Sequence, residues 1–256
     1  MTTTLGLPET IQACLFDLDG VVTRTAVVHA AAWKETFDAF LHARVGEGFR
    51  PFDKAHDYDE YVDGRPRADG VRTFLASRGI ELPEGEPGDP PDAQTVHGLG
   101  NRKNELLLEK IRTQGVEAYD GTLRYVEAAR TRGLRTAIVS SSANTRDVLR
   151  SIGAEHLFEV RIDGVVAAER GLPGKPRPDT FLAAARDLGV EPSGAAVFED
   201  ALAGMDAGRA GNFGYVVGVD RVGQNDALYA HGADVVVKDL ADLTDLAGPG
   251  EGGGRQ

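Results

Sequence analysis

The chain has 256 residues, 41% of them hydrophobic, so it can bury a full core and form either one large α/β domain or a core with a smaller insert. Its 28 Lys and Arg residues stand against 40 Asp and Glu, and the net charge of -12 disfavours nucleic acid and anionic membrane surfaces as partners. No apolar run reaches membrane-spanning length and residues 1–4 lack a secretory signal pattern, which together predict a cytoplasmic protein.

The first predicted element is a buried parallel strand in residues 11–16, an apolar run too short for a core helix. It contains the only cysteine, Cys14, which has no disulfide partner and is expected to be a small buried hydrophobe. Asp17 and Asp19 follow, and Gly20 can turn the chain so that both acids face one small ligand. Ligands of α/β proteins bind at such strand ends, although an ordinary polar turn is the alternative here.

A helical pattern begins at Thr25, and its large apolar and aromatic residues recur three or four positions apart: His29, Trp33, Phe37, Phe40 and Leu41. Taken by itself, this spacing favours a helix that packs an aromatic stripe into a core over one that presents His29 and Trp33 to a ligand. Two shorter helical patterns follow within residues 58–79. The pattern so far is helical, with no second strand.

A turn at residues 64–67 separates the two shorter helices, because its glycine and proline bend the chain and present Arg65 and Arg67. Residues 81–92 form an aperiodic surface loop to which we assign no chemistry. A helix over residues 96–114 then carries the triplet Arg102-Lys103-Asn104. A helical block that precedes any second strand indicates an inserted domain.

Strands and amphipathic helices alternate after Gly115, which predicts βαβ units and a doubly wound parallel sheet. The predicted helices cover residues 122–132, 145–152, 179–188 and 202–210, and the predicted strands cover residues 135–139, a short segment near Val160, 195–198, 214–219 and 234–237. We therefore divide the chain into a discontinuous core, residues 1–24 and 115–247, and an inserted helical domain, residues 25–114. The Gly-rich residues 248–256 are expected to form a disordered tail.

Polar side chains follow two further strands at their carboxyl ends. Ser140 follows the strand at 135–139, and Glu199 with Asp200 follows the strand at 195–198. A parallel sheet gathers these acids with the first pair at one edge, where their mutual repulsion is costly unless a cation lies among them. Mg²⁺, which prefers oxygen ligands, meets that need. The alternative for Asp200 is an ordinary helix N-cap.

Two residues are candidates for holding a phosphate. Ser140 offers a hydroxyl beside the free N–H groups of a helix start. Lys175 lies in an extended loop that Pro176 and Pro178 stiffen just before a helix. Considered singly, Ser140 is equally an ordinary helix cap and Lys175 a solvated loop lysine.

Taken together, the ordered motifs Phe16–Gly20, Ser140, Lys175–Pro176 and Glu199–Asp200 resemble the haloacid dehalogenase superfamily of phosphotransferases. The resemblance covers residues 11 to about 237 and implies a Rossmann-like core with a small helical cap at residues 25–114. It implies that Asp17 attacks phosphorus to form an aspartyl-phosphate, while Asp19 is the general acid and base. It also implies that Lys175 and Ser140 hold the transferring group, and that Mg²⁺ binds Asp17, the backbone carbonyl of Asp19, Glu199 and Asp200.

Within that superfamily, the cap resembles the β-phosphoglucomutase-like group. The resemblance implies that Arg67, Ser142 and Asn144 hold the phosphate that does not react. It implies that His29 and Lys103 contact the sugar side and help to close the cap, and Trp33 is assigned to the same binding surface.

Three positions depart from the pattern of that group. Ala143 stands where the pattern has a lysine, which removes a cation from the distal phosphate site. Arg65, by its closeness to Arg67, is a candidate to supply that charge. Arg24 stands where the pattern has an aspartate near the hinge, and Asp120 replaces a proline, a change we regard as structural.

We expect a Mg²⁺-dependent monomer that isomerises β-glucose 1-phosphate to glucose 6-phosphate through the 1,6-bisphosphate. The alternative is a sugar-phosphate phosphatase built on the same core, with water as the final acceptor. A catalytically silent sugar-phosphate-binding regulator is a third hypothesis, and the intact set Asp17, Asp19, Lys175 and Asp200 argues against it.

Overall fold

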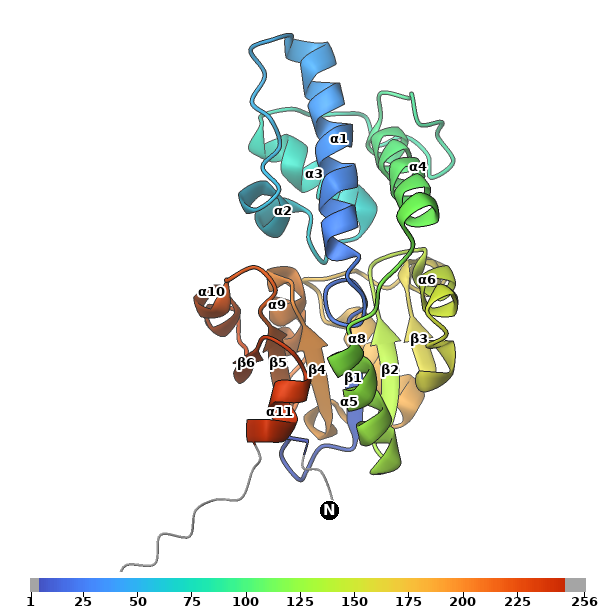
Figure 1. Ribbon diagram of the computed structural model, residues 1–256. Coiled ribbons are helices and arrows are strands. Elements are labelled where there is room, and N and C mark those ends of the chain that lie inside the picture. Colours follow the sequence, from blue (N-terminus) through green and yellow to red (C-terminus); the bar gives the residue numbers. More distant parts are fainter. Residues whose placement is uncertain (1–4, 247–256) are drawn as a thin grey trace, which may run out of the picture.

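The computed structural model describes residues 5–246, which form an α/β core with a block of four helices standing over one edge of its sheet (Figure 1). The six strands are all parallel and follow the order β3-β2-β1-β4-β5-β6. Their bounds are β1 Ala13–Phe16, β2 Arg135–Val139, β3 Val160–Ile162, β4 Ala195–Glu199, β5 Tyr215–Val219 and β6 Val235–Val237. The predicted doubly wound sheet is confirmed, whereas residues 1–4 and the predicted tail at 248–256 lie outside the described residues.

The register of the sheet aligns the carboxyl ends of its three central strands. Phe16 of β1 lies opposite Ile138 of β2 on one side and Phe198 of β4 on the other. The next backbone N–H, that of Asp17, donates to the carbonyl of Phe198 at 2.9 Å. The residues that follow β1, β2 and β4 therefore meet at one edge.

Helices cover both faces of the sheet and enclose two apolar cores. Alternate side chains of β1 point to opposite faces, so Cys14 and Phe16 pack in one core and Ala13 and Leu15 in the other. Burial raises the pKa of the Cys14 thiol, in line with the predicted inert hydrophobe. The core helices are α5 Asp120–Thr131, α6 Thr145–Ser151, α7 Gly164–Arg170, α8 Asp179–Leu188, α9 Leu202–Ala210, α10 Asn225–Ala230 and α11 Ala241–Leu246, with short 3₁₀ turns at Glu155–Leu157 and Pro192–Gly194.

The sequence pattern did not predict α7, α10 and α11. Each has only six or seven residues, too few for a readable apolar stripe. No residue of α7 is buried, and this helix is fixed by its N-cap, Asp163, whose carboxylate accepts from the backbone N–H groups of Val165 and Val166. Among residues 5–246, no helix combines the length and apolar character needed to cross a bilayer.

The helical block consists of α1 Ala26–Val45, α2 His56–Tyr61, α3 Arg67–Ser77 and α4 Val96–Gln114, and it has an apolar core of its own. Trp33 stacks on Phe37 with ring centroids 4.9 Å apart, and Phe37 lies 4.1 Å from Phe74. The aromatic stripe therefore packs inside the block, as its spacing predicts. We propose that this block is the cap domain expected at residues 25–114.

Two chain segments connect the block to the core, one after β1 and one before α5 (Figure 1). They pair with each other, since the backbone N–H of Arg24 donates to the carbonyl of Glu117 and that of Tyr119 to the carbonyl of Val22, each at 2.9 Å. The guanidinium groups of Arg24 and Arg221 lie 4.5 Å and 3.5 Å from the centre of the Tyr119 ring. The hinge is thus a hydrogen-bonded structure in which Arg24 takes part.

Candidate active site

A cavity of about 380 Å³ lies between the helical block and the carboxyl ends of the strands, a size that suits a small ligand. Its core side includes Asp17, Asp19 and Ser140. Its cap side includes Trp33 and Lys103. The other predicted substrate residues also line it, namely His29, Arg67, Ser142 and Asn144.

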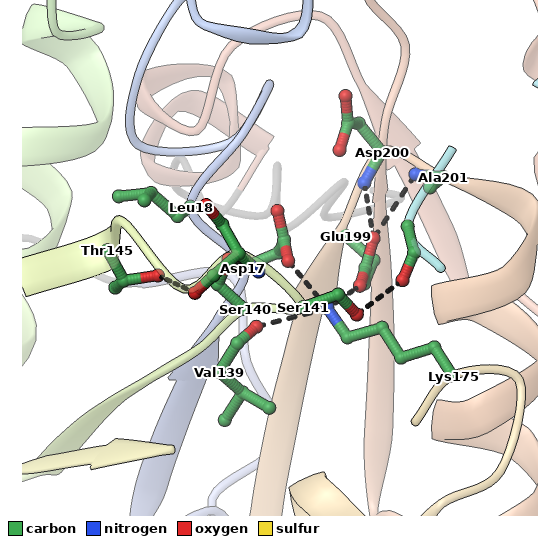
Figure 2. A network of polar contacts seen from close by, with 12 residues as sticks. Asp17, Leu18, Val139, Ser140, Ser141, Thr145, Lys175, Glu199, Asp200 and Ala201 are labelled. Atoms are coloured by element: carbon green, nitrogen blue, oxygen red, sulfur yellow. Dashed lines mark hydrogen bonds and ion pairs between the residues drawn. The ribbon is translucent and has the colours of Figure 1, made fainter. Parts of the chain in front are cut away.

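Three buried carboxylates meet at the core side of this cavity. Asp17, Glu199 and Asp200 each have an oxygen within 4.8 Å of the others, and Figure 2 shows them around the ends of β1 and β4. Oδ1 of Asp200 is buried and has no hydrogen-bond partner. Gly20, at φ +97°, permits this arrangement, because a Cβ there would lie 1.7 Å from Oδ2 of Asp200. A hard cation with oxygen ligands fits this donor set.

Lys175 is buried at the centre of the cluster, with 1% of its surface exposed. Its Nζ donates to Oδ1 of Asp17 at 2.5 Å, to the carbonyl of Val139 at 3.0 Å and to Oε1 of Glu199 (Figure 2). Burial alone lowers the pKa of this amine, but the two carboxylates outweigh it and the pKa is raised. The alternative of a solvated loop lysine is therefore wrong.

One lysine does not balance the negative charge that this edge of the sheet holds. Burial raises the pKa of Asp17 to about 6 and that of Glu199 to about 7, although Lys175 lowers both. Burial, followed by repulsion from Asp63, raises the pKa of Asp200 well above its usual range. The helix-cap alternative for Asp200 is wrong, since the N-cap of α9 is Ala201 and no side chain caps that helix.

Asp19 has different neighbours from Asp17. It accepts a hydrogen bond from the hydroxyl of Thr25, which lies 2.7 Å from the hydroxyl of Thr23. Nε2 of His29 lies 3.5 Å from Oδ1 of Asp19. Burial raises the pKa of the Asp19 carboxyl. Asp17 therefore contacts the core lysine, whereas Asp19 contacts the hinge and the first turn of α1.

Lys103 and His29 form a pair on the cap side. Nζ of Lys103 lies 3.1 Å from Nδ1 of His29 and 4.9 Å from the centre of the Trp33 ring. Burial lowers the pKa of Lys103 to about 7, and burial together with Lys103 lowers the pKa of His29 well below its usual value. Trp33 thus belongs to the cap core and to the cavity wall at once.

The loop after β2 presents the next group of predicted residues. The hydroxyl of Ser140 accepts from the backbone N–H of Ser142 at 3.0 Å, so it shapes the loop. The amide Nδ2 of Asn144 donates to Oδ1 of Asn104 on α4 at 3.0 Å. The α6 helix has no side-chain cap, so Ser140 is not a helix cap. The structure therefore brings Ser142 and Asn144 to the seam between core and cap.

Sequence reasoning missed Asp63, which lines the cavity and is buried. It shares a hydrogen bond with Tyr58, and burial raises its pKa well above the usual range. Its position directly before the turn at residues 64–67 was the only available signal. The loop at 81–92, to which we assigned no chemistry, contributes Pro87 to the cavity wall.

Known proteins resemble the chain over nearly its whole length. The family model of haloacid dehalogenase-like hydrolases matches residues 11–212. The β-phosphoglucomutase of Mycobacterium tuberculosis (strain CDC 1551 / Oshkosh) is 58% identical over 245 residues, which cover 93% of this chain and 94% of that protein. The β-phosphoglucomutase of Bacillus subtilis (strain 168) is 31% identical over 234 residues, covering 91% and 92%. The solved structure of β-phosphoglucomutase from Clostridium difficile has a TM-score of 0.72 at 26% identity and covers 91% of this chain and 93% of its own.

Proposed function

The chain belongs to the haloacid dehalogenase-like hydrolase family, in its β-phosphoglucomutase-like group, and we propose that it converts β-glucose 1-phosphate to glucose 6-phosphate through the 1,6-bisphosphate. A phosphomutase or phosphatase activity follows from membership of the group. The mutase reaction is the narrower proposal, and the names of the mycobacterial and bacillary relatives support it.

The different surroundings of Asp17 and Asp19 support separate roles in phosphoryl transfer. In our proposal Asp17 attacks phosphorus and forms the aspartyl-phosphate, because its carboxylate lies at the strand end beside Lys175. Lys175 holds the transferring group and orients Asp17. Asp19 donates a proton to the leaving oxygen and later accepts one from the attacking hydroxyl, and its bond from Thr25 fixes its direction.

The buried carboxylates support a divalent cation as cofactor. Asp17, Asp200, Glu199 and the backbone carbonyl of Asp19 would hold Mg²⁺, and the unpartnered oxygen of Asp200 is the donor with the most to gain. Bound there, Mg²⁺ supplies positive charge to the equatorial oxygens of the transferring group.

One observation carries the mutase proposal: three Lys and Arg side chains of the cap line the cavity. Arg65, Arg67 and Lys103 line it, and none lies within 4 Å of a carboxylate among the described residues. A phosphatase needs one phosphate site, whereas a mutase must seat a bisphosphate. The second candidate, a sugar-phosphate phosphatase, is favoured by Ala143, which leaves the distal end without the lysine of the group's pattern.

The test is to supply β-glucose 1-phosphate, Mg²⁺ and a trace of glucose 1,6-bisphosphate, and to measure glucose 6-phosphate and inorganic phosphate together. A hydroxyl held beside the phosphoryl-enzyme has a large effective molarity and should outcompete water, so isomerisation should dominate. Phosphate release that equals or exceeds glucose 6-phosphate formation, without dependence on the bisphosphate, would replace the mutase by the phosphatase.

A further inference from the structure

Two arginines of the cap line the cavity without a partner of their own. Nε of Arg65 is buried and has no hydrogen bond, and among the described residues no carboxylate lies within 4 Å of the guanidinium of Arg65 or Arg67. Burial lowers the pKa of Arg67. Arg78, another partly buried arginine of the cap, pairs instead with Asp57. Two unpaired guanidinium groups facing one cavity indicate a site for an anion.

The segment that carries these arginines lies against three loops of the core. The hydroxyl of Ser141 donates to the carbonyl of Gly64 at 2.7 Å. A Cβ added to Gly64 would lie 2.9 Å from Cβ of Ala201, and one added to Gly174 would lie 2.1 Å from Cγ of Pro66. The turn is therefore seated in the seam between cap and core, beside the loop that follows β2.

The backbone adds to the positive character of this place. The α3 helix begins at Arg67, and Ala68 in its first turn lines the cavity. The N–H groups of a helix's first turn lack intrahelical partners and favour an anion. Arg65 and Arg67 flank Pro66, the N-cap residue, whose φ of -55° and ψ of 142° set the direction of the turn. The arginines and the helix start therefore belong to one continuous stretch of the cavity wall, residues 65–68.

We propose that Arg65 is the second cation of the distal phosphate site and replaces the lysine that the group's pattern places at position 143. The inference rests on the proposed function and deepens it, because it assigns Arg65 a role in recognising the second phosphate of the substrate. Ala143 stands on the core loop after β2, whereas Arg65 belongs to the cap turn seated against that loop. The planar guanidinium suits a phosphate at least as well as an ammonium does.

Placing the second cation on the cap instead of on the core changes which part of the protein holds the distal phosphate. A lysine at position 143 would keep a cation on the core in any position of the cap. Here the distal cations Arg65 and Arg67 both belong to the cap, while Ser142 and Asn144 belong to the core. A distal phosphate between them joins the two parts, so affinity for the second phosphate depends on closure of the cap.

The test measures binding with turnover blocked. In an Asp17→Asn background with Mg²⁺, calorimetry gives the dissociation constants of glucose 1,6-bisphosphate and of phenyl phosphate, which has no distal phosphate. Arg65→Met should weaken the bisphosphate about tenfold or more, the size of one lost charge-assisted contact, and leave phenyl phosphate unchanged. Arg65→Lys should keep most of the affinity. Arg102→Met, which removes an exposed cap arginine that does not line the cavity, is the matched control.

A rescue experiment separates charge from structure. Ala143→Lys added to Arg65→Met should restore bisphosphate affinity, because both cations serve one phosphate. Unchanged bisphosphate affinity in Arg65→Met, or an equal loss for phenyl phosphate without rescue, would overturn the inference. Arg65→Gln takes the place of Arg65→Met if the latter does not fold. If the wild type fails to isomerise β-glucose 1-phosphate while Arg65→Met still loses the bisphosphate, the proposed function falls and the distal site stands.

Discussion

The two sides of the cavity differ in which of their charged groups lack a partner. On the core side the cation Lys175 is fully paired with Asp17 and Glu199, and carboxylates remain in excess. On the cap side, no carboxylate of residues 5–246 lies within 4 Å of the guanidinium of Arg65 or Arg67. The core side therefore suits a cation, and the two cap arginines suit an anion. In the proposed function, a divalent metal and a sugar phosphate would satisfy both sides at once.

On the core side, Asp17→Asn should cause the largest loss of turnover. An amide of the same shape cannot attack phosphorus, so turnover should fall below about 10⁻⁴ of the wild-type rate. The fold should persist, and stability can rise because a source of buried repulsion is removed. Steady-state kinetics and thermal unfolding test both statements. Substantial activity in the pure variant would remove Asp17 as nucleophile, and a phosphate trapped on another residue would identify its replacement.

The cation requirement of the core side is tested by chelation and by Asp200→Ala. Chelator should eliminate activity, Mg²⁺ should restore it, and Ca²⁺ should substitute poorly because its coordination is longer and looser. A ligand that binds only the folded state stabilises it by about 2.7 kcal/mol at 100 times its dissociation constant. Mg²⁺ should therefore raise the melting temperature of the wild type and have little effect on Asp200→Ala.

One control accompanies the metal experiment. Asp206→Ala removes a carboxylate of α9, the helix that follows Asp200. Asp206 pairs with His231 and does not line the cavity, so this variant should keep the response to Mg²⁺. Full activity in excess chelator would show that the carboxylates of the core side act without a cation.

On the cap side, Arg67→Ala removes one of the arginines that line the cavity. Isomerisation should fall about 100-fold, because a charge-assisted contact to the distal phosphate is lost. Slow hydrolysis of a small aryl phosphate should be spared, since that substrate reacts at Asp17 and has no distal phosphate. The two rates are measured on the same preparation, with Arg102→Ala as the control. An equal loss in both reactions would place Arg67 in the chemistry of the core side.

The two sides also differ in how far sequence could predict them. Strand register fixes the core side: apolar runs end at Asp17, Ser140 and Glu199, and a parallel sheet must bring these ends together. The burial of Lys175 was harder to predict, because a loop stiffened by prolines gives no sign that its lysine is buried. Only the order of the motifs indicated its role.

The cap side depends on packing between helices, which spacing does not specify. The spacing of Trp33 predicts a residue of an apolar core, but Trp33 also lines the cavity. No sequence pattern indicated that Asp63 lines the cavity too. Asn104 meets Asn144 across the seam, a contact between residues 40 positions apart that no local signal predicts. In the core, short helices such as α7, which has no buried residue, escaped detection because they are too short to show an apolar stripe.

The smallest expected effect is the pH dependence that Lys103 gives to stability and to ligand binding on the cap side. Burial lowers the pKa of Lys103 to about 7, below its usual value of 10.5, so folding displaces a proton between these two values. The unfolded chain then binds more protons than the folded one, and this group makes the free energy of unfolding rise with pH from about 7 to 10.5. Affinity for an anionic sugar phosphate should change in the opposite direction, falling about fivefold between pH 7 and 9 as the ammonium is lost.

Lys103→Arg should flatten the affinity profile, because a guanidinium keeps its charge over this range. Lys110→Met, on the same helix but paired with Glu35 away from the cavity, should keep the wild-type profile. Titration of glucose 6-phosphate binding at several pH values, beside denaturant unfolding at the same values, measures both trends. Affinity and stability that rise or fall together would show that Lys103 contributes to the fold and not to anion binding, and the cap side would lose one of its cations.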